Sequence, residues 1–142
     1  MKVLPRKIDY IETESRGQRL WEERGIYNYD REDDTRPRYS KDTPPPYPSG
    51  DFHMGNVLNW TYFDIRGRFK RMQGYNVHFP QGWDCHGLPT EVAVEKAYGI
   101  HRSDLPPDEF RKLCREWIEQ YIEIMKEAIT KLGCSVDWSL EY

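Results

Sequence analysis

The chain has 142 residues, with 21 Lys+Arg against 24 Asp+Glu, a formal net charge of -3 and 37% hydrophobic residues. A length of roughly 100–200 residues is usual for one domain, and such a chain buries about two-thirds of its unfolded surface. Aromatic residues at 14% exclude a chain that stays disordered by composition. The slight acidity argues against a general nucleic-acid coat protein, because phosphate affinity grows with the number of cations presented.

The start of the chain and its cysteines indicate the compartment. Residues 1–10 contain charges but no apolar h-region, and no run of about 20 apolar residues occurs anywhere, so neither export nor membrane insertion is expected. The three cysteines have no C-x-x-C spacing, which fits reduced thiols better than a disulfide framework or a zinc site. We therefore expect a cytoplasmic protein, with Cys114 and Cys134 in its core.

The first 42 residues are predicted to form a helix followed by a connection. A loose helical stripe of apolar residues comprises Ile8, Ile11, Leu20 and Trp21. It predicts a helix over residues 8–24. Residues 29–42 carry many charges and almost no apolar side chains besides tyrosine, so we expect an exposed connection there. Residues 1–42 are thus an N-terminal helix with its connection, and residues 43–142 form the main domain.

A run of prolines precedes the second helix. Four prolines between residues 42 and 50 forbid a helix and remove backbone donors, so this segment must be extended. After it, apolar residues recur at spacings of three and four over residues 54–73, which predicts an amphipathic helix with its apolar stripe in the core. That apolar set comprises Met54, Val57, Leu58, Thr61, Tyr62, Ile65, Phe69 and Met72.

The rest of the chain completes an alternating pattern. Residues 75–79 are typical of a short strand, residues 82–87 of a glycine-bounded loop, and residues 89–98 of a short helix that begins near a proline. The longest helix is predicted over residues 108–132, with a stop at Gly133. Extended segment, helix, strand, loop and helix in this order predict a parallel α/β unit.

The junction before the second helix has the features of an anion site. The extended chain turns at Gly50 and a helix starts at His53, so free N–H groups and the positive end of the helix dipole face outward, which suits a phosphate chain. His53 adds a donor, Gly55 lets a flat ring approach the backbone, and Asn56 adds an amide. The alternative is that His53 only caps the helix and that Gly55 has a packing role.

This junction resembles the first signature of the class I aminoacyl-tRNA synthetases, a His-hydrophobic-Gly-His tetrapeptide, which stands here as His53-Met54-Gly55-Asn56. The resemblance covers most of residues 8–142. Its further blocks are Asp42-Thr-Pro-Pro-Pro46, Pro48-Ser-Gly50, Arg68-Phe-Lys-Arg-Met-Gln-Gly-Tyr-Asn-Val77, Gly82-Trp-Asp-Cys-His-Gly-Leu-Pro-Thr-Glu91 and Leu132-Gly-Cys-Ser-Val-Asp-Trp-Ser139. Together they most resemble the valyl-tRNA synthetases of the archaeal kind, while single blocks are also similar to the isoleucyl and leucyl enzymes.

The resemblance implies that residues 43–142 are the first half of a Rossmann-like catalytic domain with a parallel sheet, truncated before the editing insertion. It implies ATP-dependent activation of valine, or of isoleucine or leucine, to an aminoacyl adenylate, followed by transfer to tRNA, with Mg²⁺ accompanying ATP. By motif match, His53 and Asn56 are the implied catalytic residues, and Gly55 binds ATP with them. His53 would contact the phosphates, Gly55 would accept the adenosine, and Asn56 takes the place of the second histidine.

The amino-acid site is implied by two other blocks. In this subgroup the aspartate of Gly-Trp-Asp, here Asp84, pairs with the α-ammonium of the substrate. A carboxylate in a loop after a strand lies where an α/β sheet presents ligand-binding groups. The alternative is that Asp84 caps the helix near Pro89. Pro45 and Pro46 match positions in the wall of the amino-acid pocket, and their alternative role is a stiff connector.

Other residues with reactive side chains fit no site. Cys85 and His86 are adjacent with no second pair of ligands, which is a poor zinc geometry, and a Cys-His catalytic pair is not formed by adjacency. His78 and His101 are expected at the surface. The basic residues of the second helix either approach the tRNA acceptor stem or are simply solvated; they are Arg66, Arg68, Lys70 and Arg71.

The second family signature, Lys-Met-Ser-Lys-Ser, does not occur in the sequence. By family comparison we expect the N-terminal portion of a longer synthetase, inactive alone, with most tRNA contacts elsewhere. The alternative is a non-catalytic remnant that binds a ligand or a partner protein. Half of a doubly wound sheet leaves helix faces uncovered, so we expect the missing half of the synthetase, or self-association, to cover them.

Overall fold

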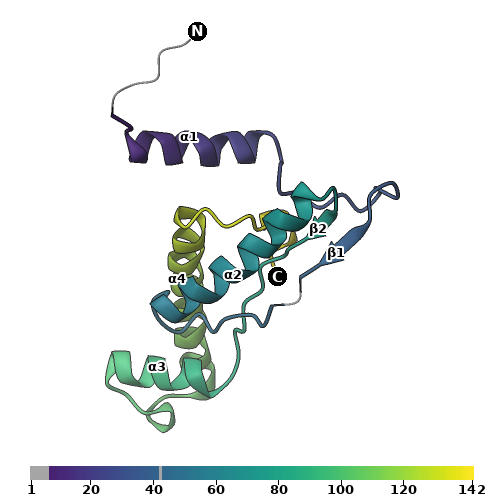
Figure 1. The fold of residues 1–142 in the computed structure, drawn as a ribbon. Coiled ribbons are helices and arrows are strands. Elements are labelled where there is room, and N and C mark those ends of the chain that lie inside the picture. Colours follow the sequence, from purple (N-terminus) through teal and green to yellow (C-terminus); the bar gives the residue numbers. More distant parts are fainter. Residues whose placement is uncertain (1–6, 42) are drawn as a thin grey trace.

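The computed structural model describes residues 7–41 and 43–142 (Figure 1). Asp42, in the predicted Asp-Thr-Pro-Pro-Pro run, lies outside the described residues. The elements in chain order are helix α1 (Tyr10–Glu23), strand β1 (Arg38–Ser40), helix α2 (Met54–Met72), strand β2 (Asn76–His78), helix α3 (Leu88–Tyr98), the 3-10 helix η1 (Arg102–Asp104), helix α4 (Pro107–Lys131) and the 3-10 helix η2 (Trp138–Leu140). Each predicted helix is therefore present.

β1 and β2 form a parallel pair with α2 as the crossover between them, which confirms the predicted α/β unit (Figure 1). The register places Tyr39 opposite Val77. The first strand, however, lies inside the stretch predicted as a connection, and the proline-rich segment after it is extended without being a strand. The strand ends before the prolines because they lack the N–H donors that a sheet requires. The Lys41 N–H still donates to His78 O at 2.9 Å.

The last residues of the chain extend this sheet irregularly on the other side of β2. Pro80 and Asp137 form an isolated parallel bridge, and Asp137 N–H donates to Phe79 O at 2.9 Å. Farther along, Tyr142 N–H donates to Gln81 O at 3.0 Å. The loop that follows β2 is therefore held between the proline-rich segment and the C-terminal segment.

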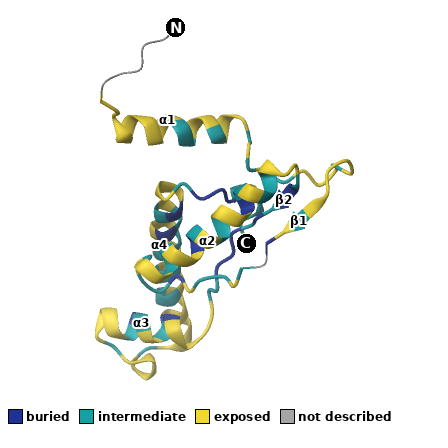
Figure 2. Ribbon diagram, in the orientation of Figure 1, coloured by how far each residue is buried: buried dark blue, intermediate teal, exposed yellow. Residues whose placement is uncertain are grey.

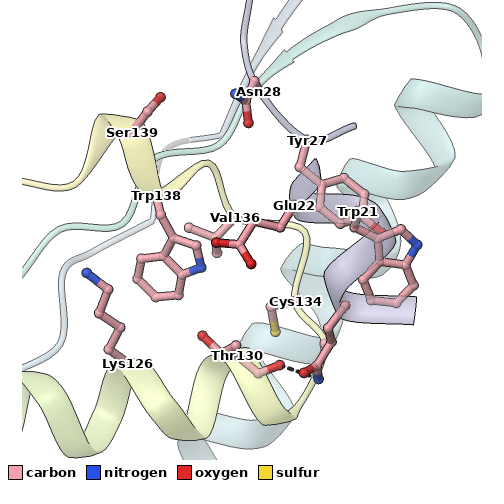
Figure 3. Close-up of a pocket in the computed structure, with 12 residues that line it drawn as sticks. Trp21, Glu22, Tyr27, Asn28, Lys126, Thr130, Cys134, Val136, Trp138 and Ser139 are labelled. Atoms are coloured by element: carbon pink, nitrogen blue, oxygen red, sulfur yellow. Dashed lines mark hydrogen bonds between the residues drawn. The ribbon is translucent and has the colours of Figure 1, made fainter. Parts of the chain in front are cut away.

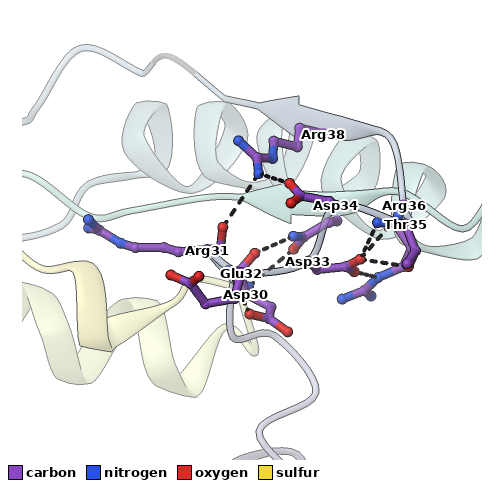
Figure 4. Close-up of polar contacts among 9 residues, drawn as sticks. Asp30, Arg31, Glu32, Asp33, Asp34, Thr35, Arg36 and Arg38 are labelled. Atoms are coloured by element: carbon purple, nitrogen blue, oxygen red, sulfur yellow. Dashed lines mark hydrogen bonds and ion pairs between the residues drawn. The ribbon is translucent and has the colours of Figure 1, made fainter.

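Side-chain turns organise the connection before β1 (Figure 4). The Asp33 carboxylate accepts hydrogen bonds from the Thr35 N–H at 2.8 Å and the Thr35 hydroxyl at 2.7 Å, and it pairs with the Arg36 guanidinium. These hydrogen bonds from Thr35 and Arg36 hold the pKa of Asp33 well below its usual range. Asp34 pairs with Arg38 at 2.7 Å, so the exposed connection follows a defined path into β1.

The core lies where α4, β2 and the C-terminal segment meet, as the dark blue parts of Figure 2 show. Its fully buried side chains include Phe79 and Ile129. Cys134 is buried as expected, and burial raises the pKa of its thiol to about 12, whereas Cys114 is half-buried. Within the described residues, none of the helices combines the length and the apolar character that crossing a membrane requires.

The apolar stripe of α2 is not in the core, contrary to the prediction. The α2 stripe is defined by six large side chains that are between 54% and 86% exposed: Met54, Leu58, Tyr62, Ile65, Phe69 and Met72. The buried residues of this helix are instead Trp60 and Gly67. Trp60 packs against the rings of Phe52 and Phe63 in the core, and its indole N–H is satisfied there by Gln81 Oε1 at 2.9 Å. Helical spacing then turns the stripe away from the core.

Candidate amino-acid and nucleotide site

The loop after β2 and the proline-rich segment lie side by side. Asp84 N–H donates to Pro46 O at 2.9 Å, so the structure brings together two of the residues predicted to bind the amino acid. Pro45, Pro46 and Asp84 are each half-buried. Proline residues next to a residue with a carboxylate suit a ligand with an apolar part and an ammonium group.

The Asp84 carboxylate does not cap a helix. Helix α3 has Gly87 at its N-cap and receives no hydrogen bond from a side chain there, so the capping alternative is wrong. Among the described residues, the carboxylate of Asp84 accepts one long hydrogen bond of 3.5 Å, from the His86 N–H. Most of its acceptor capacity is therefore left for a ligand.

His53 caps α2. Its Nδ1 accepts hydrogen bonds from the N–H groups of Gly55 at 3.1 Å and Asn56 at 3.3 Å, and Asn56 Oδ1 accepts one from the His53 N–H at 3.2 Å. This is a reciprocal capping box. The prediction that these two backbone N–H groups are free is wrong, because the histidine ring occupies them.

The cap defines which atom of His53 can meet a phosphate. Since Nδ1 is an acceptor, a neutral ring carries its proton on Nε2, and the side chain is exposed. A Cβ at Gly55 would lie 3.0 Å from His53 Cε1, tighter than ordinary contact. Glycine at this position therefore lets the ring lie over the helix start with its Nε2–H donor available to an anion.

The remaining candidates have structural contacts. The Cys85 thiol lies 3.7 Å from Trp83 O, and burial, with a smaller effect of Asp84, raises its pKa, so it is a poor nucleophile. His78 pairs with Ser40 at 3.1 Å, and His101 caps η1. No group of three possible metal ligands occurs within residues 7–41 and 43–142.

Two arginines of α2, Arg68 and Arg71, face the protein, whereas Arg66 is exposed and donates from Nε to the Tyr39 hydroxyl at 2.9 Å. Arg68 contacts Asp64 at 2.6 Å and the Tyr27 hydroxyl at 2.7 Å, and Arg71 contacts the Ser135 hydroxyl at 2.6 Å. The Asp64 carboxylate also accepts from the Ser135 N–H at 2.6 Å. Arg68 and Arg71 thus join α2 to distant segments, which neither the tRNA prediction nor the solvated alternative foresaw.

Sequence reasoning also missed a polar cluster beside the loop after β2. Trp83 Nε1–H donates to Glu141 Oε1 at 2.9 Å, and Lys126 Nζ donates to Glu141 Oε2 at 2.5 Å. Trp83 and Glu141 are 58 residues apart, so no local spacing could reveal the contact. The nearest signal in the sequence was the family match of the Trp-Asp-Cys-His block. It identified this loop as a candidate site but not Glu141, which contacts it, or Lys126, which pairs with Glu141.

A cavity of about 540 Å³ opens away from these residues, between α1, the end of α4 and the C-terminal segment (Figure 3). Aromatic side chains of Trp21, Tyr27 and Trp138 form part of its wall, with Glu22 and Lys126 as charged members. None of the residues predicted to bind ATP or the amino acid lines it. The candidate site therefore lies outside this cavity: Pro46 and Asp84 are in contact with each other, and His53 lies at the start of α2.

Comparisons with known proteins give the chain a context. The family model described as tRNA synthetases class I (I, L, M and V) matches residues 16–142. The valine–tRNA ligase of Methanocaldococcus jannaschii is 56% identical over 135 residues, and that of Methanothrix thermoacetophila is 51% identical over 142 residues. These matches cover 94% and 100% of this chain but 15% and 16% of the relatives, so the chain spans a small part of their length.

A solved structure supports the same fold. The LeuRS of Agrobacterium radiobacter K84, in a ternary complex with tRNA and LeuAMS, superimposes with a TM-score of 0.76 at 27% identity. The match covers 96% of this chain and 16% of that one. The parallel strand pair, its crossover helix and the long α4 thus belong to a larger known architecture.

Proposed function

Since the chain belongs to the class I tRNA synthetases of the isoleucine, leucine, methionine and valine group, we propose that it forms the ATP- and valine-binding corner of a valine–tRNA ligase. The observation that carries the proposal is made at Asp84: its backbone N–H donates to Pro46 O, and its carboxylate is not used as a helix cap. Identities of 50–56% to valine–tRNA ligases favour valine as the substrate.

The proposed reaction has two steps. An oxygen of the valine carboxylate attacks the α-phosphorus of ATP, and pyrophosphate leaves; a hydroxyl at the 3′ end of tRNA then attacks the carbonyl carbon, and AMP leaves. Such chemistry needs positioning and charge stabilisation more than a protein nucleophile. We assign the Nε2–H of His53 to the ATP phosphates, Gly55 to the adenosine, and Asn56 to holding the His53 backbone.

The amino acid is proposed to bind between Asp84 and the prolines Pro45 and Pro46. The Asp84 carboxylate pairs with the α-ammonium of valine, and the rings of Pro45 and Pro46 face its branched side chain. Mg²⁺ enters with ATP and is held mainly by the phosphates, because Mg²⁺ keeps several of its waters and usually binds together with substrate phosphates.

Partners follow from the exposed surface and from the family. The α2 stripe exposes six large apolar side chains along one helix, and contiguous apolar patches of this kind often mark interaction surfaces. We propose that the remaining catalytic domain of a synthetase packs on it, with a second copy of this chain as the alternative, and that tRNA is the acceptor substrate. Three unpaired cysteines are compatible with the reducing cytoplasm.

Binding of valine to the chain tests the proposal. NMR titration should show the Asp84 amide shifting with valine and less with isoleucine or leucine. Asp84→Asn keeps the shape and removes the charge, so valine affinity should fall about tenfold or more, whereas Asp108→Asn, in an exposed ion pair of α4, should change nothing. Stronger binding of leucine or isoleucine would assign another enzyme of the group, and no amino-acid binding would favour a non-catalytic remnant.

A further inference from the structure

The loop that carries Asp84 is supported by one carboxylate from the other end of the chain. Glu141 uses both oxygens: Oε1 accepts from the Trp83 indole at 2.9 Å, and Oε2 pairs with Lys126 of α4 at 2.5 Å. Trp83 is 9% exposed and belongs to the core cluster. The carboxylate thus joins three separate parts of the fold directly next to Asp84.

The backbone of the same segment holds the loop as well. Tyr142 N–H donates to Gln81 O at 3.0 Å, and Trp83 N–H donates to Tyr142 O at 3.0 Å. Between them, a Cβ at Gly82 would lie 2.7 Å from Cε2 of the Tyr142 ring, closer than real Cβ atoms approach other atoms. The loop also bonds to the proline-rich segment through the Asp84 N–H and Pro46 O. It is therefore hydrogen-bonded to the C-terminal segment on one side and to the proline-rich segment on the other.

Glu141 is ionised in its contacts with Lys126 and Trp83. Burial raises the pKa of Glu141, but the hydrogen bonds from Lys126 and Trp83 outweigh burial and lower it overall. The group is therefore a carboxylate at neutral pH, which accepts from both donors at once. Lys126 also contacts the Trp138 ring, since its Nζ lies 5.1 Å from the ring centroid.

We propose that Glu141 is a positioning residue of the amino-acid site: held by Lys126, it fixes the Trp83 indole and thereby the orientation of the Asp84 carboxylate. The inference rests on the proposed function, because it makes Glu141 a determinant of affinity for the amino acid. Glu141 touches neither ATP nor valine in this arrangement and acts through Trp83.

Three variants of the chain test the proposal. Glu141→Ala removes both contacts, Glu141→Gln keeps an oxygen acceptor for the indole N–H, and Glu127→Ala removes a matched exposed ion pair with Lys131 on α4. For each, NMR titrations give the dissociation constants of valine and of ATP, and hydrogen exchange gives the protection of the Trp83 and Asp84 amides.

We expect Glu141→Ala to weaken valine binding about tenfold and to speed exchange of both amides, with ATP affinity unchanged. Glu141→Gln should restore valine affinity to within about threefold, and Glu127→Ala should match the unmodified chain. Equal losses for valine and ATP would indicate general destabilisation and overturn the proposal. If the unmodified chain bound no valine, the proposed function would fail, while unchanged amide exchange in Glu141→Ala would separately refute the positioning role.

Discussion

Lys41, at the end of β1, is a charged group placed in the core. The residue is 7% exposed, and its Nζ lies 4.4 Å from the centroid of Phe79 and 5.1 Å from that of Phe63. Among the described residues, Nζ has no hydrogen-bond partner. Burial lowers the pKa of Lys41 from 10.5 to about 8, against the opposing charge of Asp64.

This pKa makes stability depend on pH in a defined direction. Between pH 8 and about 10.5 the unfolded chain holds its Lys41 proton more tightly than the folded chain, so the free energy of unfolding rises with pH. Because one pKa unit corresponds to about 1.4 kcal/mol, Lys41 costs about 3 kcal/mol at pH 7. Lys41→Met keeps a similar length without the charge, and we expect it to stabilise the fold by about 1–3 kcal/mol at pH 7.

Urea unfolding followed by circular dichroism at several pH values between 7 and 10.5 measures the effect. The stability gap between Lys41→Met and the unmodified chain should be largest at pH 7 and should close as the pH approaches 10.5. Lys131→Met, at an exposed site on α4, serves as the control and should show no such trend. A gap that stays constant over this range would refute the conclusion that the cost of Lys41 is its buried charge.

Three further predictions address the cap, the core and the exposed surface. His53→Ala should cost about 1 kcal/mol of stability by removing the N-cap, whereas His53→Asn should keep the cap; both should weaken ATP binding if the Nε2–H donor contacts the phosphates, as thermal unfolding and ATP titration together would reveal. Trp60→Phe leaves the buried Gln81 Oε1 without its 2.9 Å donor, so urea unfolding should give a loss of about 1–3 kcal/mol; a loss below about 0.5 kcal/mol would contradict this role. Ile65→Lys, in the centre of the exposed α2 stripe, should change stability by less than about 0.5 kcal/mol and reduce association in sedimentation velocity; unchanged association would show that the α2 stripe is not the contact.

Local patterns predicted the elements of the fold well. The spacing of apolar residues in α4 and the position of Gly133 after it follow from helix geometry alone, and the structure ends α4 at Lys131. The first strand was misplaced because Arg38–Ser40 carries no apolar alternation, and its extended form is set by pairing with β2. Strand formation depends on a partner, which sequence spacing does not contain.

The candidate site was likewise only partly predictable from the sequence. A histidine followed by glycine and asparagine was recognisable as the start of a helix and as a nucleotide signature, and the structure adds that the ring occupies the first N–H groups. The contact between Asp84 and Pro46 follows from parallel neighbours in a sheet. Glu141 was not predictable as a support of this loop, since its contact with Trp83 joins residues far apart in the chain.

Spacing, prolines and short motifs act within a few residues, so the amino-acid sequence was enough to predict the helices and the family of the chain. Which side of α2 is buried depends on long-range contacts: Trp60 bonds to Gln81, and Arg68 and Arg71 contact distant segments of the chain. Only the tertiary structure decided this, and it also decided that a lysine lies in the core at Lys41 and that Glu141 holds Trp83. These contacts join segments brought together by the sheet, and their energies depend on burial that no local pattern records.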